Sequence, residues 1–168
     1  MSRILGIDPG SRVTGYGLID GDAGRPVLVT HGCIRQPEGE PFPERLARIF
    51  AEVTSVIQAH DPAEMAIEDV FVSRNAASAL KLGQARGAAI CAGAAAGLPV
   101  AEYTPARVKQ ALVGRGGADK RQVAHMVGML MGVREPLQAD AADALAVAIC
   151  HLHHRQTAER RPARVRAS

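Results

Sequence analysis

The sequence predicts a single α/β domain built on a mixed five-stranded sheet flanked by helices. Three strand-like segments come first and are joined by turns too short for a crossover, so they should form an antiparallel meander. Two further strands alternate with helical segments, which favours parallel additions to the same sheet. With 168 residues, 47% of them apolar and 22% charged, the chain is long enough to bury one sizeable core.

The five predicted strands are apolar runs bounded by Pro, Gly and Asp. They cover residues 3–8, 12–20, 25–35, 64–71 and 98–104. The first two are followed by "PGS" and "DGDAG", which are compositions typical of tight turns.

Five helices are predicted, over residues 41–60, 75–97, 105–114, 120–132 and 138–154. In the first, apolar residues recur at the 3.6-residue period of a helix. Asn75 or Ser73 is suited to cap the second helix, and Pro105 suits the first turn of the third. We assign residues 1–154 to the domain and expect the Arg-rich residues 155–168 to be a disordered basic tail.

Several classes of protein are excluded by composition. No apolar run approaches the roughly 18 residues of a membrane span, and the opening "MSRILGID" lacks the apolar stretch of a signal peptide. The three cysteines, Cys33, Cys91 and Cys150, are widely spaced and form no CxxC motif. The sequence therefore predicts a cytoplasmic protein without disulfides or a membrane segment.

Charge is distributed unevenly along the chain. Residues 1–69 carry six Lys or Arg and eleven acids, whereas residues 70–134 carry nine Lys or Arg and two acids. Residues 135–154 are acidic again, with three acids and no Lys or Arg. A basic middle between two acidic segments suits a polyanion held beside a cation site, although solvated surface gives the same pattern.

Acidic residues close two predicted strands and open the last predicted helix. Asp8 ends the first strand, and Glu68 and Asp69 lie at the end of the fourth. Asp140 and Asp143 are three residues apart at the start of the last helix, so they share one helix face. If the first and fourth strands are neighbours, Asp8 and Glu68 meet at one edge of the sheet.

Four carboxylates gathered in this way repel one another unless cations neutralise them. Oxygen ligands suit Mg²⁺ or Mn²⁺, and two such ions about 4 Å apart can activate water against a phosphodiester. Each acid also has an ordinary explanation: a turn residue for Asp8, a helix cap for Asp140, a surface position for Glu68. Their joint placement favours the metal site. The opposite, apolar face of the last helix should pack on the sheet through Ala141, Leu145, Ala148, Ile149 and Leu152.

Five stretches resemble the RuvC family of bacterial Holliday-junction resolvases. They are "ILGIDPGSRVTGYGLI", "MAIEDVFVSRNAASALKLGQARGAAI", "YTPARVKQALVG", "GADKRQVAHMV" and "QADAADALAVAICH", and the resemblance extends over residues 3–153. It implies an RNase H-like fold, a homodimer, and symmetric nicking of four-way DNA junctions in recombination and repair. It also implies two Mg²⁺ ions per subunit, with Mn²⁺ as a substitute, and the branch-migration complex RuvAB as a partner.

The resemblance also implies roles for individual residues. The catalytic, metal-binding acids match Asp8, Glu68, Asp140 and Asp143. Phe71 matches an aromatic near the junction centre, where it could stack on a base or else belong to the core. Lys109 and Lys120 match DNA-contacting residues; the weaker candidates for phosphate contacts are Arg74, Lys81, Arg86 and Arg121. Asp69 departs from the uncharged Gln common in the family, which adds a negative charge beside the site.

Two other functions stay open at this stage. "GIDPGS" also resembles the first phosphate loop of actin-like sugar kinases and ATPases, although those proteins need two such domains. A non-catalytic junction-binding protein is the second alternative, which the intact set of four acids disfavours. The "HLHH" run at residues 151–154 suggests metal ligands but lies at a helix end, where solvated histidines are the simpler interpretation.

Overall fold

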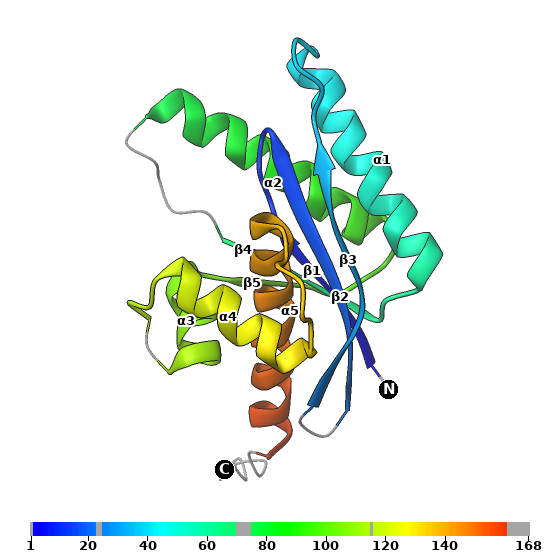
Figure 1. Cartoon of the computed structure of the whole chain (residues 1–168). Helices are drawn as coiled ribbons and strands as arrows, with labels where there is room; N and C mark the ends of the chain where they lie inside the picture. Colours follow the sequence, from blue (N-terminus) through cyan, green and yellow to red (C-terminus); the bar gives the residue numbers. More distant parts are fainter. Residues whose placement is uncertain (1, 23–24, 70–74, 115, 161–168) are drawn as a thin grey trace, which may run out of the picture.

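The computed structural model describes residues 2–22, 25–69, 75–114 and 116–160. A five-stranded sheet in the order β3-β2-β1-β4-β5 forms its centre (Figure 1). The strands are β1 (Ser2–Asp8), β2 (Val13–Asp22), β3 (Arg25–Arg35), β4 (Glu64–Glu68) and β5 (Val100–Tyr103). The predicted mixed sheet is therefore confirmed.

Strand pairing follows the predicted division into antiparallel and parallel parts. β1 pairs antiparallel with β2, and β2 pairs antiparallel with β3 through an irregularity at Leu18/Ile19. β1 and β4 are parallel neighbours, with Ile7 opposite Ile67, and β5 continues the parallel half. Because parallel strands end at the same edge, the last residues of β1 and β4 are brought together there.

Helices cover both faces of the sheet. They are α1 (Phe42–His60), α2 (Ala76–Ala95), α3 (Pro105–Val113), α4 (Lys120–Met131) and α5 (Ala139–Arg160). α1 and α2 lie on one face and α5 lies on the other, with α3 and α4 packed outside α5 (Figure 1). Asn75 caps α2 by accepting bonds from the backbone N–H groups of Ala77 and Ser78, whereas Ser73 lies outside the described residues.

Two hydrophobic cores result, one on each face of the sheet. Leu5 and Ile7 of β1 point to the α1/α2 face, and Ile4 points to the α5 face. This alternation is the period of two expected of a strand. It continues to the strand ends, so position 8 of β1 and position 68 of β4 both belong to the α5 face.

The last helix differs from the expected amphipathic element. An apolar stripe on one face was predicted, but α5 is buried on nearly all sides between Ala141 and Leu152, with only Asp143 partly exposed. The reason is tertiary: the sheet covers one side of α5 while α3 and α4 cover the other. The helix can lie this close to the sheet because a Cβ at Gly6 of β1 would be 2.1 Å from the carbonyl oxygen of Ala144.

The last helix also ends later than the predicted residue 154. α5 continues to Arg160 without a break. Arg155, assigned to the tail, contacts Glu64 at the start of β4 with Nη1 2.8 Å from Oε1. Residues 161–168 lie outside the described part of the chain. None of the helices that the structure describes is long and apolar enough to cross a membrane.

Candidate active site

Two acidic side chains come from the ends of neighbouring parallel strands. Asp8 is the last residue of β1 and Glu68 is the last residue of β4. Strand alternation directs both to the α5 face of the sheet, and a hydrogen bond joins their side chains. The predicted meeting of Asp8 and Glu68 at one sheet edge is therefore what the structure contains.

The other two acids come from the first turns of α5. Asp140 and Asp143 both contribute to the electrostatic repulsion felt by Asp8, so the helix start lies beside the strand ends. A close backbone contact sets this position, because a Cβ at Gly15, the residue paired with Asp8, would be 1.9 Å from the carbonyl oxygen of Asp140. Only glycine allows the helix to begin so near the sheet.

Burial and mutual repulsion change the protonation of the strand pair. Desolvation, followed by the negative charge of Glu68, raises the pKa of Asp8 from 3.8 to about 8. Desolvation and the charge of Asp143 raise the pKa of Glu68 as well. Without a cation, the pair therefore holds a proton at neutral pH. A divalent cation would take the place of that proton.

The metal expected from the sequence can be tested against these residues. Among the described side chains, no group of three His, Cys, Asp or Glu is placed so that it could hold a metal ion as it stands. The chemistry of the donors nevertheless fits, since carboxylate oxygens are the ligands of hard divalent cations and this cluster carries unneutralised charge. Asp8, Glu68, Asp140 and Asp143 are the residues that would hold the cation after adjustment of their side chains.

Two lysines lie at the rim of the acidic cluster. Lys120, the first residue of α4, donates a hydrogen bond to Oδ2 of Asp143 over 3.3 Å, while its side chain remains 82% exposed. Asp143, Asp8 and Glu68 together favour the charged form and raise the pKa of Lys120, with Asp143 contributing most. Lys109 of α3 is close enough for its charge to favour ionised Glu68. Both side chains could therefore contact a polyanion that approaches the acids.

The remaining predicted DNA contacts fall in different surroundings. Arg121 is exposed on α4, and Lys81 is exposed on α2 with Nζ 5.9 Å from the centre of the Phe42 ring. Arg86 is engaged within the protein, by the backbone carbonyl of Glu68 and by two carboxylates. Phe71 and Arg74 lie outside the described residues.

A further polar residue supports the loop after Asp8. Thr14 is fully buried, and its hydroxyl donates to the carbonyl of Gly10 over 3.0 Å and accepts from the N–H of the same residue. The bond pair closes the "DPGSRVT" turn and so fixes the strand end that carries Asp8. Sequence reasoning did not single out Thr14. A Ser or Thr four residues after a Gly in a tight turn is a local signal that could have done so.

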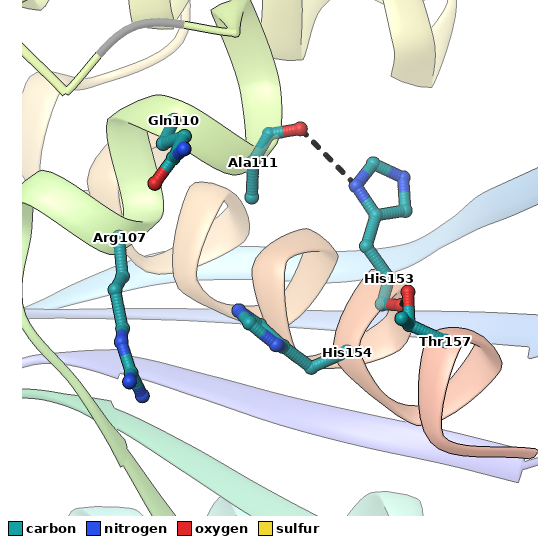
Figure 2. Close-up of a pocket in the computed structure, with 6 residues that line it drawn as sticks. All are labelled: Arg107, Gln110, Ala111, His153, His154 and Thr157. Carbon is teal, nitrogen blue, oxygen red and sulfur yellow. Dashed lines mark hydrogen bonds between the residues drawn. The ribbon is translucent and has the colours of Figure 1, made fainter. Parts of the chain in front are cut away.

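The histidines after residue 150 form a separate region, away from the acids. His151 is buried and bridges two groups: the Tyr103 hydroxyl lies 2.8 Å from its Nδ1, and Oε2 of Glu64 lies 2.6 Å from its Nε2. His153 and His154 line a pocket of about 350 Å³ between α3 and α5 (Figure 2). Its other lining residues are Arg107, Gln110, Ala111 and Thr157, and none is acidic.

Comparisons with known proteins agree with one another. The family model described as "Crossover junction endodeoxyribonuclease RuvC" matches residues 4–151. A curated relative of that name from Methylococcus capsulatus is 62% identical over 166 residues, which is 99% of either chain. A second, from Halorhodospira halophila, is 60% identical and covers 92% of each chain.

Solved structures give the same picture. The structure described as Thermus thermophilus RuvC in complex with a Holliday junction substrate superposes with a TM-score of 0.88 at 36% identity, over 94% of this chain and 97% of that one. The yeast mitochondrial Holliday junction resolvase Ydc2 superposes with a TM-score of 0.67 at 14% identity, over 94% and 85% of the two chains. The second likeness concerns the fold alone, which is RNase H-like.

Proposed function

This chain belongs to the RuvC family of crossover junction endodeoxyribonucleases, and we propose that it resolves four-way DNA junctions by paired symmetric nicks. The observation that carries the proposal is the cluster of carboxylates at one sheet edge. Burial and mutual repulsion raise the pKa of Asp8 to about 8. The carboxylates are therefore stable in their ionised form only when cations neutralise them, which is typical of a metal-dependent active site.

In this proposal, Asp8, Glu68, Asp140 and Asp143 hold two Mg²⁺ ions, with Mn²⁺ as a substitute. Bound divalent ions supply a water of lowered pKa and positive charge for the leaving oxygen. The chain itself supplies the negative charge that attracts the ions, on two strand ends and one helix start. Because these elements are packed against each other, the backbone positions that carry the four acids are fixed without the DNA.

The DNA follows the basic residues around this edge. Lys120 and Lys109 lie nearest the acids, which suits them to phosphates on either side of the cut. The Lys120–Asp143 contact opens when a phosphate competes for the ammonium group. Arg121 and Lys81 are exposed and supply more distant phosphate contacts, and Phe71 stacks on a base at the junction centre.

Two symmetric nicks require two copies of the site, and we propose a homodimer formed through α2. Leu80 on this helix is 70% exposed. Gly83 and Gly87 lie nearby on the helix with open space around them, so a partner backbone could approach closely. Measuring the mass in solution of the protein and of Leu80→Glu tests this, because the charged variant should be monomeric.

We propose a cytoplasmic protein directed to junctions by the branch-migration complex RuvAB. The alternative of an ATPase is disfavoured by a family match that covers residues 4–151.

The deciding experiment is cleavage of a synthetic four-way junction in Mg²⁺, with and without ATP, beside a linear duplex of the same sequence. We expect two nicks at symmetric positions on the junction, no effect of ATP, and little cleavage of the duplex. Chelation should abolish cleavage, and Mn²⁺ should restore it. Equal cutting of junction and duplex, or a requirement for ATP, would contradict the proposal.

A further inference from the structure

Arg86 of α2 contacts the end of β4 from the face of the sheet opposite to the candidate active site. Its side chain is only 16% exposed. Nε donates to the backbone carbonyl of Glu68 over 3.1 Å, and Nη2 donates to a carboxylate oxygen of Glu102. The same nitrogen lies 3.6 Å from Oδ1 of Asp69. One guanidinium thus joins the end of β4, the residue after it, and the neighbouring strand β5.

The two carboxylates that contact Arg86 lie on the α2 face of the sheet, whereas the acidic cluster lies on the α5 face. Tyr103 of β5 belongs to the core on the α5 face, so its neighbour Glu102 belongs to the α2 face. Asp69 follows Glu68 and meets Arg86 on this same α2 face. The carboxyl group of Glu68 itself faces Asp8 on the other side. Arg86 therefore reaches Glu68 only through its main chain.

The end of β4 depends on such support. The pairing of β1 with β4 ends at Ile7 and Ile67, so Glu68 has no ladder partner on the β1 side. On the β5 side it pairs with Tyr103, and the N–H of Asp69 donates to the Tyr103 carbonyl over 2.7 Å. Among the residues that the structure describes, Arg86 adds a further bond at this strand end, from its Nε to the carbonyl of Glu68.

We propose that Arg86 is a positioning residue for the metal ligand Glu68, acting through the backbone from the far face of the sheet. The inference rests on the proposed function, in which Glu68 holds a divalent ion. A planar guanidinium can donate to a carbonyl and to carboxylates at fixed angles, which an ammonium group cannot reproduce. Small displacements of a ligand weaken a metal site because its oxygens must be held within about 0.5 Å of their working positions.

The surroundings of Arg86 argue against a phosphate contact. A carbonyl already accepts from Nε, and two carboxylates lie at Nη2. The group Arg86, Asp69 and Glu102 carries a net negative charge. A phosphate approaching this group would meet repulsion rather than attraction. The same arrangement explains how the chain tolerates Asp69 beside the site, since the positive charge of Arg86 faces it.

Arg86→Gln tests the proposal, with nicking measured in single turnovers over a range of Mg²⁺ concentrations. We expect the Mg²⁺ concentration for half-maximal nicking to rise on the order of tenfold, as for other groups that orient metal ligands. Junction affinity measured in Ca²⁺ or chelator, and its dependence on salt, should stay as in the unaltered protein. Arg86→Lys should recover only part of the Mg²⁺ response.

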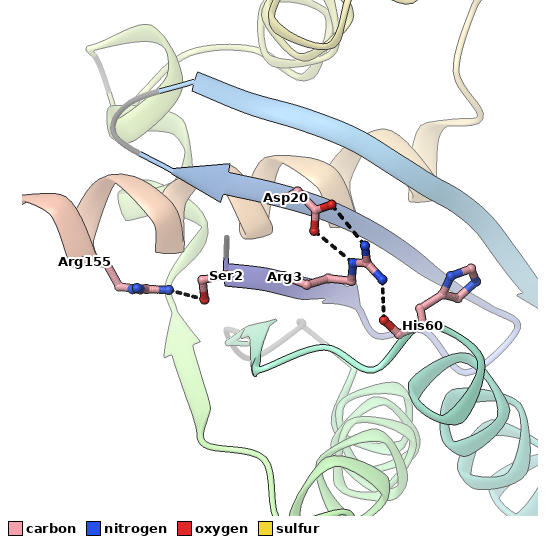
Figure 3. Close-up of polar contacts among 5 residues, drawn as sticks. All are labelled: Ser2, Arg3, Asp20, His60 and Arg155. Atoms are coloured by element: carbon pink, nitrogen blue, oxygen red, sulfur yellow. Dashed lines mark hydrogen bonds and ion pairs between the residues drawn. The ribbon is translucent and has the colours of Figure 1, made fainter.

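Arg3 provides a matched control at the opposite end of the sheet. Its Nε and Nη2 donate to Asp20, and its Nη1 donates to the carbonyl of His60 (Figure 3). Arg3→Gln removes the same kinds of bond far from the acids, so it should lower the melting temperature without shifting the Mg²⁺ midpoint.

The outcomes separate the possibilities. A loss of junction affinity with a salt slope lower by about one, at an unchanged Mg²⁺ midpoint, would make Arg86 a DNA contact and overturn the inference. Effects equal to those of Arg3→Gln, or failure of both Arg86 variants to fold, would assign it a general structural role instead. If the unaltered protein does not nick junctions in Mg²⁺, the proposed function fails rather than this inference alone.

Discussion

Gly15 of β2 lies directly against the main chain of Asp140, so that α5 begins in contact with the strand paired to β1. A Cβ at position 15 would be 1.9 Å from the Asp140 carbonyl oxygen and 3.0 Å from the N–H nitrogen of Ala141. Both neighbours are backbone atoms, which cannot turn away as a flexible side chain can. The position of the two helix acids therefore depends on a missing side chain in the sheet.

Gly15→Ala should accordingly damage both stability and activity. We expect the free energy of unfolding to fall by about 3 kcal/mol, at the upper end for overpacking, because a backbone segment must shift. Nicking at a temperature where the variant is folded should also fall, since the shift moves Asp140. Gly128→Ala is the control: the nearest atom to its Cβ is 3.9 Å away, and alanine in a helix should raise stability by about 1 kcal/mol. Equal melting temperatures for both variants would refute the close contact.

The raised pKa of Asp8 predicts how metal-free stability depends on pH. Between about 4 and 8 the unfolded chain loses this proton while the folded protein retains it, so stability should fall as pH rises through this window. Asp8→Asn should flatten that fall and raise the melting temperature at pH 8 in chelator. Melting curves from pH 5 to 9 provide the measurement, and Mg²⁺ should stabilise the unaltered protein more than the variant.

Asp20 serves as the control for this pH dependence, because its pKa is lowered whereas that of Asp8 is raised. Its hydrogen bond with Arg3 lowers the pKa of Asp20, so its contribution to stability is present at neutral pH and is lost on acidification. Asp20→Asn should therefore lower the melting temperature at pH 7, where Asp8→Asn raises it. If the two Asn variants shift the melting temperature in the same direction, the protonation assigned to Asp8 is wrong.

Glu68 and Asp69 should respond differently to loss of charge. Glu68→Gln should fold, bind junctions and show no Mg²⁺-dependent nicking, because its carboxyl group lies beside Asp8. Asp69→Asn should keep most nicking and lose less than about 1 kcal/mol of stability, since its side chain is 44% exposed and its ion pair with Arg86 is long. Single-turnover cleavage by both variants distinguishes them, and an inactive Asp69→Asn beside an active Glu68→Gln would reverse our assignment of the ligand.

Two truncations should separate the end of α5 from the residues beyond it. Removing residues 161–168 deletes three arginines, which should weaken junction binding and flatten its salt dependence while leaving the melting temperature unchanged. Removing residues 155–168 also breaks the Arg155–Glu64 ion pair, worth up to about 1 kcal/mol for this partly exposed geometry. Arg155→Gln in the full chain isolates that pair, and both truncated proteins should still nick at saturating concentration.

Local signals explain why much of the fold could be predicted from the sequence. The short turns after Asp8 and around residue 23 required antiparallel pairing of the first three strands, and the bounds of β3 matched the prediction. The meeting of Asp8 and Glu68 followed from two strands that each end in an acid, once those strands were taken as neighbours. The strands and turns were predicted from local periodicity, whereas the β1–β4 pairing was an assumption that the structure confirms.

Other features depend on tertiary contacts that no local pattern reports. The burial of α5 on nearly all sides arises from the packing of α3 and α4 against it, so its sequence shows no polar face to mark the solvent. Arg86 could be taken for a phosphate contact because its partners, Asp69 and Glu102, come from separate strands. In the part of α5 past residue 154, Arg155 contacts Glu64, which lies far earlier in the chain, so no local pattern indicates this contact.

The enclosed span of α5, from Ala141 to Leu152, restricts the mutations this chain can accept. A helix with a solvent-exposed face tolerates substitutions at every third or fourth residue. Between Ala141 and Leu152, only Asp143 is partly exposed, and it is a proposed metal ligand. Its alanines leave no volume for larger groups, and a polar replacement would lack partners. In saturation mutagenesis, we therefore expect most substitutions to be deleterious at every position of this span, without the 3.6-residue periodicity of a helix that has an exposed face. Over evolutionary time the segment can drift only by exchanging one small apolar residue for another.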